Sequence, residues 1–145
     1  METQCKDATF LYEDLIEKAD VVIADVPCSG LGVIGKKGDI KYNMTPEKQK
    51  ELVALQRKIL GNAWRYLKPD GVLVFSTCTI NKEENIENLK WMLDEYPLET
   101  VDISSYFSED MACDTLKEGY IQMLPGINHS DGFFISKLKR KGRVQ

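Results

Sequence analysis

The sequence has little of what several common protein classes require. It contains one histidine, His129, and four cysteines without a CxxC pair, so the closely spaced ligands of a zinc site are missing. No apolar run reaches the ~18 residues that span a bilayer, and the N-terminus shows no signal peptide. We therefore expect a cytoplasmic chain with reduced thiols, no metal and no membrane segment.

Two further absences narrow the function. The glycines do not form G-x-G-x-x-G between a strand and a helix, so no dinucleotide-binding loop is predicted. The formal net charge of −4 argues against a nucleic-acid binder held by bulk charge alone. With 145 residues, of which 43% are hydrophobic and 29% charged, the chain has the size and composition of one globular domain with a core.

The most informative stretch, VVIADVPCSG, runs from residue 21 to residue 30. Its apolar, β-branched start predicts a buried strand over 21–26. Pro27 cannot donate to a sheet ladder and Gly30 permits a sharp turn, so pairing should stop there. Asp25 and Cys28 are thereby delivered to the carboxyl end of a strand, which is where open α/β sheets bind ligands.

A long helix and a second strand follow. Thr45 suits an N-cap and Pro46 the first helical position, and an apolar stripe continues to about residue 67. The KPDG segment at 68–71 then predicts a tight turn, before a buried strand over 72–76.

Strand, helix and strand make a βαβ unit, whose two strands are parallel. Cys28 follows the first strand and Cys78 follows the second. Because the carboxyl ends of neighbouring parallel strands meet at one edge of the sheet, we expect the two thiols to lie side by side.

Weaker patterns complete the chain. We expect a short helix over 11–18, a long loop over 29–45, and a capping box at Asn81 and Glu84 that starts a helix ending before Pro97. Strands are expected over 99–103, 120–124 and 133–138, the last two antiparallel, with irregular structure over 104–118.

Together these residues resemble the RNA (cytosine-5) methyltransferase family, in particular its bacterial Sun/Fmu-type branch that acts on 16S rRNA. DVPCSG at 25–30 matches the family's D-x-P-C-S motif, and TCT at 77–79 matches T-C-S/T with EEN following at 83–85. DIKY at 39–42 and DGFF at 131–134 match the loop after the first thiol and the closing strand. The resemblance covers almost the whole chain, with its motifs in the family's order.

The resemblance implies S-adenosylmethionine-dependent methylation of cytosine carbon 5 through a covalent adduct. Carbon 5 is too weak a nucleophile unaided, and a thiolate that adds to carbon 6 activates it. By resemblance Cys78 is that nucleophile, Asp25 holds and protonates the ring edge from a buried position, and Cys28 serves product release. The target base is expected to be flipped out or single-stranded.

The resemblance also suggests binding residues. Asp7 resembles the acidic residue near the adenine of S-adenosylmethionine, and Asp25 and Pro27 belong to the same cofactor site. Candidate contacts to the RNA partner are the lysines of the 29–45 loop, which a solvated loop would explain equally well: Lys36, Lys37 and Lys41.

Parts of the family's domain have no counterpart in these residues. The glycine-rich cofactor loop, the first strand and an N-terminal RNA-binding domain are absent from residues 1–145. We therefore expect the C-terminal part of a catalytic domain: a truncated Rossmann-like α/β fold with parallel strands and an antiparallel strand or hairpin near the C-terminus. Such a fragment should be inactive alone, bind S-adenosylmethionine weakly or not at all, and self-associate through the apolar edge at 21–26.

Three alternatives remain open from the residues alone. An exocyclic amino-methyltransferase carries D-P-P-Y where this chain has D-x-P-C, and it needs no covalent thiol. A cysteine hydrolase would use His129 and no cofactor. A binding or scaffolding fragment would have no catalytic activity.

Overall fold

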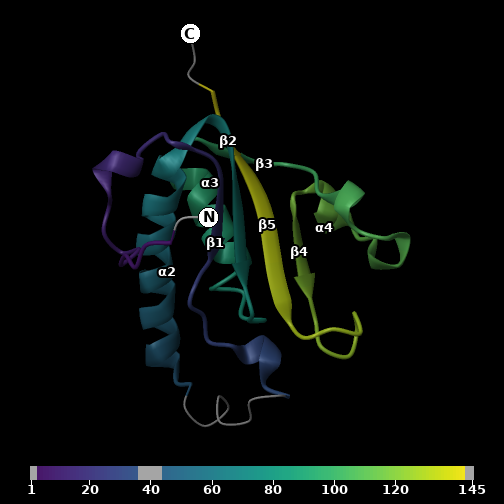
Figure 1. Cartoon of the computed structure of the whole chain (residues 1–145). Coiled ribbons are helices and arrows are strands. Elements are labelled where there is room, and N and C mark those ends of the chain that lie inside the picture. Colours follow the sequence, from purple (N-terminus) through teal and green to yellow (C-terminus); the bar gives the residue numbers. More distant parts are fainter. Residues whose placement is uncertain (1–2, 36–43, 143–145) are drawn as a thin grey trace.

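The computed structural model describes residues 3–35 and 44–142 (Figure 1). Its strands are β1 (Ala19–Asp25), β2 (Leu67–Thr77), β3 (Leu98–Thr100), β4 (Tyr120–Met123) and β5 (Phe133–Arg140). Its helices are α2 (Pro46–Tyr66), α3 (Ile86–Glu95) and α4 (Asp114–Lys117), with 3-10 turns at Glu13–Leu15, Leu31–Val33, Ser104–Tyr106 and Glu109–Met111. None of the helices in the described part of the chain has the length and apolarity to span a bilayer.

The strands form one mixed sheet in the order β1-β2-β5-β3, with β4 also paired to β5. β1 and β2 are parallel, from Val21 opposite Val72 to Asp25 opposite Ser76. β5 runs antiparallel to β2, β3 and β4. The expected α/β architecture is confirmed, with a parallel first pair joined by α2 and antiparallel strands near the C-terminus. Within the described residues β1 pairs with β2 alone, so its other edge is open.

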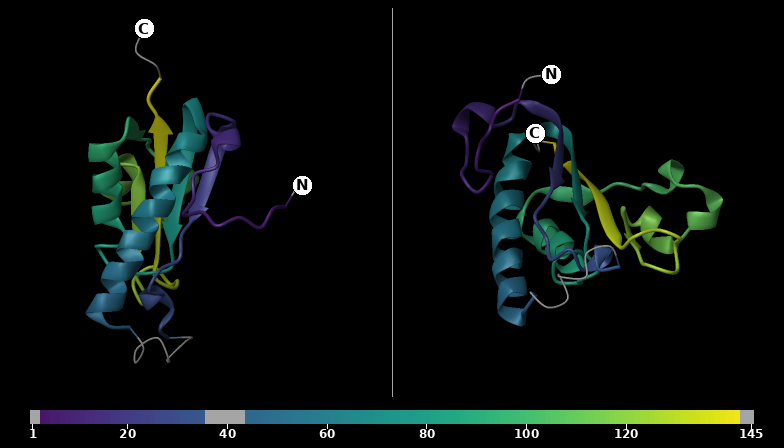
Figure 2. Two further views of the ribbon diagram at one scale, coloured as in Figure 1. Left: turned by 90° about the vertical axis from the view of Figure 1, so that its left-hand side faces the viewer. Right: turned by 60° about the horizontal axis from the view of Figure 1, so that its bottom comes forward.

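One face of the sheet is packed. α2 and α3 lie on that face (Figure 2), and the core between helices and sheet includes Leu60, Phe75, Leu89 and Phe134, all almost fully buried. Thr45 caps α2 by accepting a hydrogen bond from the N–H of Lys48 at 3.3 Å, as expected. Burial of each such apolar side chain contributes about 1.5–3 kcal/mol, so this face anchors β1 and β2 in place.

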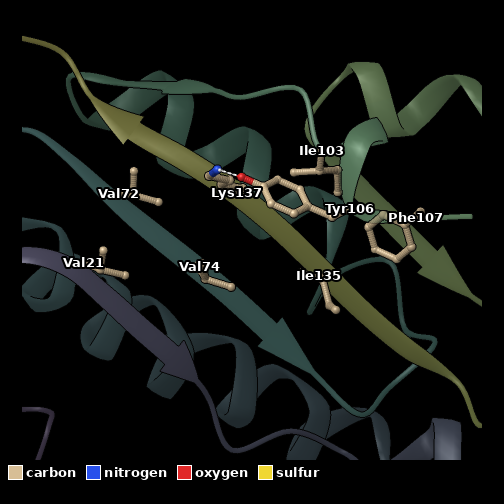
Figure 3. Close-up of a pocket in the computed structure, with 8 residues that line it drawn as sticks. All are labelled: Val21, Val72, Val74, Ile103, Tyr106, Phe107, Ile135 and Lys137. Carbon is tan, nitrogen blue, oxygen red and sulfur yellow. Dashed lines mark hydrogen bonds between the residues drawn. The ribbon is translucent and has the colours of Figure 1, made fainter.

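The opposite face is only partly covered. A second, smaller cluster forms around Ile103, Leu116 and Ile121, and beside it lies a hollow of about 460 Å³ that Figure 3 shows in front of the sheet, with the helices behind. At the β1 side of this face Val21 is 57% exposed and Ile23 is 73% exposed. Strands of parallel sheets are normally buried on both faces, so this apolar surface is unusual.

Three local expectations were wrong in detail. The helix expected over 11–18 is only the 3-10 turn Glu13–Leu15. The KPDG segment is not a turn before the strand: Leu67 is buried and already pairs with Ala19, so 68–71 form an irregularity inside β2, where Asp70 has a φ of 67°. The strand expected over 99–103 is the shorter β3.

The expected capping box does not form either. The N-cap of α3 is Asn85, without a side-chain cap, and Asn81 instead accepts a hydrogen bond from the N–H of Glu83 at 3.0 Å. Glu84 is fully buried and its carboxylate accepts hydrogen bonds from the loop after β1. The local pattern assigned the Glu84 side chain to the start of α3, but in the structure it makes long-range hydrogen bonds instead.

Candidate active site

The loops that follow β1 and β2 bring two thiols together. Val26 N–H donates to the carbonyl of Ser76 at 3.2 Å, which extends the pairing one residue beyond β1. Just past that point the Sγ atoms of Cys28 and Cys78 lie 3.1 Å apart. Both cysteines are free and partly buried. The expectation that these two thiols meet at one edge of the sheet is confirmed.

The surroundings of Cys28 disfavour its thiolate. Burial first, and then the hydrogen bond with Cys78, raise the pKa of Cys28 from 9.0 to about 12. Cys28 therefore keeps its proton at neutral pH and can donate it toward the sulfur of Cys78. The pair thus consists of a thiol that holds a proton beside one whose sulfur can accept a hydrogen bond.

Asp25 lies at the same edge but differs from expectation. It accepts a hydrogen bond from Ser76 Oγ at 2.9 Å, yet it is exposed instead of buried. The reason is its position: Asp25 follows Ile23 by two residues on the open side of an edge strand, where no described residue covers it.

Asp7 stands in the N-terminal segment as an exposed acceptor. Its Oδ1 accepts from the N–H of Thr9 at 2.9 Å and from the Thr9 hydroxyl at 2.7 Å. These two hydrogen bonds lower the pKa of the Asp7 carboxyl from its usual value of 3.8. Asp7 is therefore a fixed, negatively charged acceptor.

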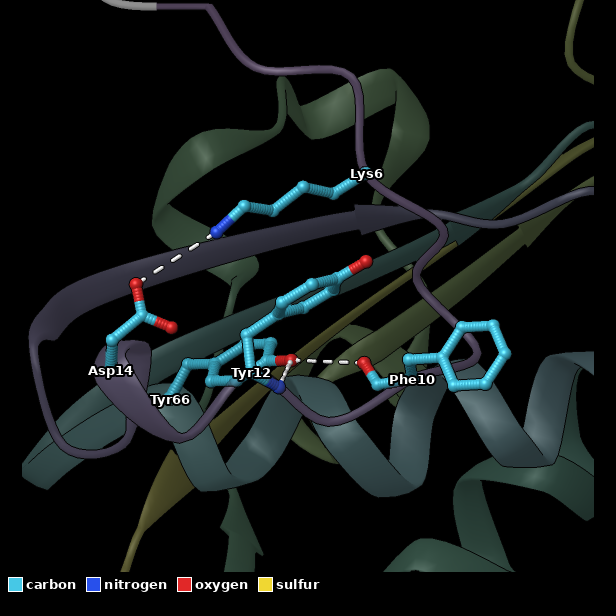
Figure 4. Close-up of polar contacts among 5 residues, drawn as sticks. All are labelled: Lys6, Phe10, Tyr12, Asp14 and Tyr66. Atoms are coloured by element: carbon cyan, nitrogen blue, oxygen red, sulfur yellow. Dashed lines mark hydrogen bonds and ion pairs between the residues drawn. The ribbon is translucent and has the colours of Figure 1, made fainter.

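Side chains of α2 hold this segment in place. Asn62 Nδ2 donates to the carbonyl of Ala8 at 3.0 Å, and the hydroxyl of Tyr66 donates to the carbonyl of Phe10 at 3.4 Å. The same hydroxyl accepts from the N–H of Tyr12 at 3.1 Å (Figure 4). The segment that carries Asp7 is thereby tied to the helix that connects the two thiol-bearing strands.

A hollow of about 280 Å³ lies between these elements. Ala8 lines it from the N-terminal segment, Asp25 and Pro27 from the end of β1, and Ile59 and Tyr66 from α2. The structure therefore places the residue next to Asp7 around the same hollow as Asp25 and Pro27.

Other candidates are less informative. His129 is exposed in the β4–β5 loop with a φ of 51°, and the sulfur of Cys78 faces Cys28 instead of an imidazole. Lys36, Lys37 and Lys41 fall outside the described residues. Within residues 3–35 and 44–142, no three histidine, cysteine or carboxylate side chains are grouped as metal ligands.

A set of buried polar side chains behind the thiols was not predicted from the sequence. Gln56, Glu84, Asn85 and Asn88 are each at most 1% exposed. Gln56 carried a usable signal, because it lies four residues from both Leu52 and Leu60 in the apolar stripe of α2. A polar residue at such a position is buried and needs a hydrogen-bond partner.

The backbone of Gly32 connects the loops after β1 and β2 with the segment just before β5. Its N–H donates to the carbonyl of Cys78 at 3.1 Å, and its own carbonyl accepts from the N–H of Gly132 at 2.8 Å. A Cβ at position 32 would lie 2.1 Å from the Gly132 oxygen. Only glycine therefore fits at position 32, between the two cysteine loops and the start of β5.

Thiols and a carboxylate at the carboxyl ends of parallel strands, beside a hollow, place the chain in the class of α/β proteins that bind their ligands at that edge. The chain belongs to the family described as 16S rRNA methyltransferase RsmB/F, whose model matches residues 2–139. The resemblance noted from the sequence is confirmed at this level.

Individual relatives agree with the family. The chain is 38% identical over 133 residues to ribosomal RNA small subunit methyltransferase F of Cronobacter sakazakii and to the same protein of Klebsiella pneumoniae, covering 90% of this chain and 28% of each relative. It thus spans little more than a quarter of the length of these relatives.

Solved structures share the fold. The crystal structure of PH0851 matches with a TM-score of 0.80 and 35% identity, over 92% of this chain and 29% of that one. The structure of NSun6 from Pyrococcus horikoshii with SFG matches with a TM-score of 0.74 and 29% identity, over 93% of this chain and 33% of that one.

The Gly32 contact predicts a stability effect. Gly32→Ala should lower the free energy of unfolding by about 1–3 kcal/mol, because a methyl group would be forced against backbone atoms that cannot rotate away. Gly35→Ala is the matched control, since a Cβ there meets nothing within 4 Å, and it should change stability by less than about 0.5 kcal/mol. Urea denaturation followed by circular dichroism measures both; equal effects would contradict the contact.

The thiol pair predicts a pH dependence. In Cys78→Ala the pKa of Cys28 should fall below about 12, because the acceptor of the Cys28 hydrogen bond is lost, but stay above 9.0 because burial remains. The raised pKa stabilises the fold below 9.0, and this contribution disappears as the pH rises through about 12. The rate of Cys28 alkylation against pH, read by peptide mass spectrometry, measures the shift; an unchanged or higher pKa in the variant would refute it.

Proposed function

We propose that this chain is the base-attacking part of an RNA methyltransferase that transfers a methyl group from S-adenosylmethionine to carbon 5 of cytosine in 16S rRNA. The observation that carries the proposal is the 3.1 Å contact of Cys28 and Cys78 at the edge that also holds Asp25. Membership of the rRNA methyltransferase family supports it.

The geometry suits covalent activation of the base. The thiolate of Cys78 forms a bond to carbon 6, the C5–C6 double bond opens, and the carboxyl group of Asp25 gives a proton to N3, which makes carbon 5 an enamine-like nucleophile. Asp25 would also hold the N3 edge by a hydrogen bond. After methylation the proton on carbon 5 leaves to a base, its electron pair re-forms the C5–C6 double bond, and the S–C6 bond breaks.

Cys28 has a distinct part in the last step. It keeps its proton at neutral pH, and its sulfur lies 3.1 Å from the sulfur that must depart. A hydrogen bond from Cys28 stabilises the departing thiolate of Cys78, because an ionised acceptor makes a stronger hydrogen bond than a neutral one. We therefore propose that Cys78 attacks the base and that Cys28 assists its release.

We assign S-adenosylmethionine, which would supply the methyl group, to the hollow beside β1. Asp25 and Pro27 line this hollow, and the ionised Asp7, next to the lining residue Ala8, would accept a hydrogen bond from the adenine amino group. The neighbour that was solved with SFG, an analogue of S-adenosylmethionine, supports this cofactor.

We propose that the 145-residue chain alone binds this cofactor weakly and is inactive. Two residues that line the hollow are left uncovered, because Ile23 is 73% exposed and Asp25 is exposed as well. Isothermal titration with S-adenosylmethionine should give no micromolar binding. An rRNA partner would place the protein in the cytoplasm, and Lys36, Lys37 and Lys41 remain candidate RNA contacts outside the described residues.

A trapping experiment tests the chemistry. RNA that carries 5-fluorocytosine cannot lose a proton from carbon 5, so the adduct should persist on a denaturing gel. We would use a chimera in which this chain replaces the matching segment of the Cronobacter sakazakii relative, with S-adenosylmethionine. The adduct should disappear in Cys78→Ala and remain in Cys28→Ala, because only the first removes the attacking sulfur.

The other outcomes discriminate among the alternatives. Methyl transfer without an adduct would overturn the covalent mechanism and favour transfer to an exocyclic nitrogen. Neither adduct nor transfer would favour a binding fragment. Hydrolytic activity that does not require S-adenosylmethionine but is lost in His129→Ala would favour a cysteine hydrolase.

We also propose that the chain self-associates through β1. Its outer edge is unpaired within the described residues, and the exposed Val21 and Ile23 make that edge apolar. Ile23→Lys should shift the chain toward monomer in light scattering across a concentration series. Ile127→Lys, a change at a residue 68% exposed in the β4–β5 loop, is the control that should leave association unchanged. A monomeric parent chain at high concentration would refute the proposal.

A further inference from the structure

A buried carboxylate lies behind the two thiols, in a position that the proposed chemistry does not use. Glu84 is 0% exposed, although a buried carboxylate is costly unless it is fully hydrogen-bonded. It lies just before α3, six residues after Cys78 in the sequence, and its partners come from two other segments. Such a group calls for a structural or functional reason.

The first of these segments contains Cys28. Ser29 N–H donates to Glu84 Oε2 at 2.8 Å, and the Ser29 hydroxyl donates to Oε1 at 2.5 Å. Gln56 Nε2, from α2, donates to the same Oε2 at 2.9 Å and to the carbonyl of Pro27 at 2.9 Å. Both neighbours of Cys28 are thus fixed directly or through one amide to Glu84.

The second link leads to Cys78. The single proton of the Ser29 hydroxyl points to Glu84, so the Thr79 hydroxyl must donate to Ser29 Oγ, at 2.7 Å. Asn81 N–H donates in turn to Thr79 Oγ1 at 3.2 Å. The hydrogen bonds therefore run in one direction, from the loop after Cys78 through Ser29 to the carboxylate.

Asn85 completes the arrangement on the Cys78 side. The hydroxyl of Thr77 donates to Asn85 Oδ1 at 2.5 Å, and Asn85 Nδ2 donates to the carbonyl of Thr79 at 2.9 Å. Asn85 thus forms hydrogen bonds with the residues before and after Cys78, while Glu84 connects that loop to the loop that contains Cys28.

We propose that Glu84 is a positioning residue that sets the distance and orientation of Cys28 relative to Cys78. The proposal deepens the proposed function and rests on it for its catalytic meaning. Glu84 touches neither sulfur; it acts through Ser29, Thr79 and Gln56. Its carboxylate is needed because only an acceptor at both oxygens can receive the Ser29 N–H, the Ser29 hydroxyl and the Gln56 amide together.

An amide at this position cannot reproduce the pattern. The NH2 of Glu84→Gln would have to donate to Ser29, which reverses the Ser29–Thr79 hydrogen bond. The Thr79 oxygen then accepts from both Ser29 and Asn81, and its own proton loses the acceptor that Ser29 supplied. The two cysteine loops should therefore lose their fixed separation while the fold is retained.

Capture by a dithiol reagent measures that separation without RNA or cofactor. Phenylarsine oxide bridges two sulfur atoms only when they are close, whereas iodoacetamide reacts with each thiol separately. With the exposed Cys5 and Cys113 replaced by serine, the parent chain should bind the arsenical through Cys28 and Cys78. Glu84→Gln should weaken this capture by about tenfold, in line with the loss of one hydrogen bond to a charged group.

Two controls separate positioning from general destabilisation. Glu83→Gln alters the neighbouring exposed carboxyl and should leave capture unchanged. Leu60→Val loosens the core at a fully buried residue and should lower the melting temperature without weakening capture. Ser29→Ala, which removes the hydroxyl link but keeps the backbone one, should give an intermediate loss and provides the test if Glu84→Gln does not fold.

The outcomes distinguish this proposal from the one it rests on. Capture in Glu84→Gln and Ser29→Ala equal to that of the parent would overturn the positioning role, whatever the methylation assays show. Capture lost to the same extent in Leu60→Val would also overturn it. A loss confined to the Glu84 and Ser29 variants supports it, and the 5-fluorocytosine experiment then reports separately on the chemistry.

Discussion

The parallel pairing of β1 with β2 is the constraint on which the site depends. Cys28 and Cys78 are fifty residues apart in sequence, and no local interaction could bring them together. The crossover through α2 makes both strands run in the same direction. The register, with Asp25 opposite Ser76, brings the loops that follow the two strands to one edge of the sheet. The rest of the active-site geometry consists of adjustments made after that pairing is in place.

Those adjustments are polar and buried. Backbone hydrogen bonds align the strands, but β1 ends at Asp25 and β2 at Thr77, and the cysteines lie in the loops that follow, beyond the last hydrogen bond between the two strands at Val26. Two loops without ladder hydrogen bonds would normally be mobile. Here the loops are held by side-chain hydrogen bonds instead, made by the fully buried carboxylate of Glu84 and the amides of Gln56 and Asn85. Because each of these groups is costly to bury unpaired, the network favours one arrangement of the loops.

The sequence predicted the parts of the fold that follow from periodicity and turn chemistry. The Thr45 cap, the β1-α2-β2 unit, the meeting of the thiols and the antiparallel β4–β5 pair are all confirmed. Glu84 shows where such reasoning ends. Its spacing from Asn81 imitates a capping box, but its partner Ser29 is 55 residues away, and nothing in the local pattern reports a contact of that range. The exposure of Asp25 was missed for a similar reason, since burial depends on which elements cover an edge strand.

The two sides of the candidate site differ in how far the described residues define them. The thiols rest on the packed face, where the core under α2 and α3 and the Glu84 network hold them. The proposed cofactor side lies at the open edge of β1, beside the exposed Ile23 and the uncovered Asp25. Preorganisation lowers the reorganisation that a reaction requires, so the thiol side is the preorganised part of the proposed site, whereas the proposed cofactor side needs further contacts. The relatives, of which this chain spans 28%, have the additional length from which such contacts could come. The geometry of the thiol pair therefore depends on residues within this chain, and it can be studied separately from the proposed cofactor binding.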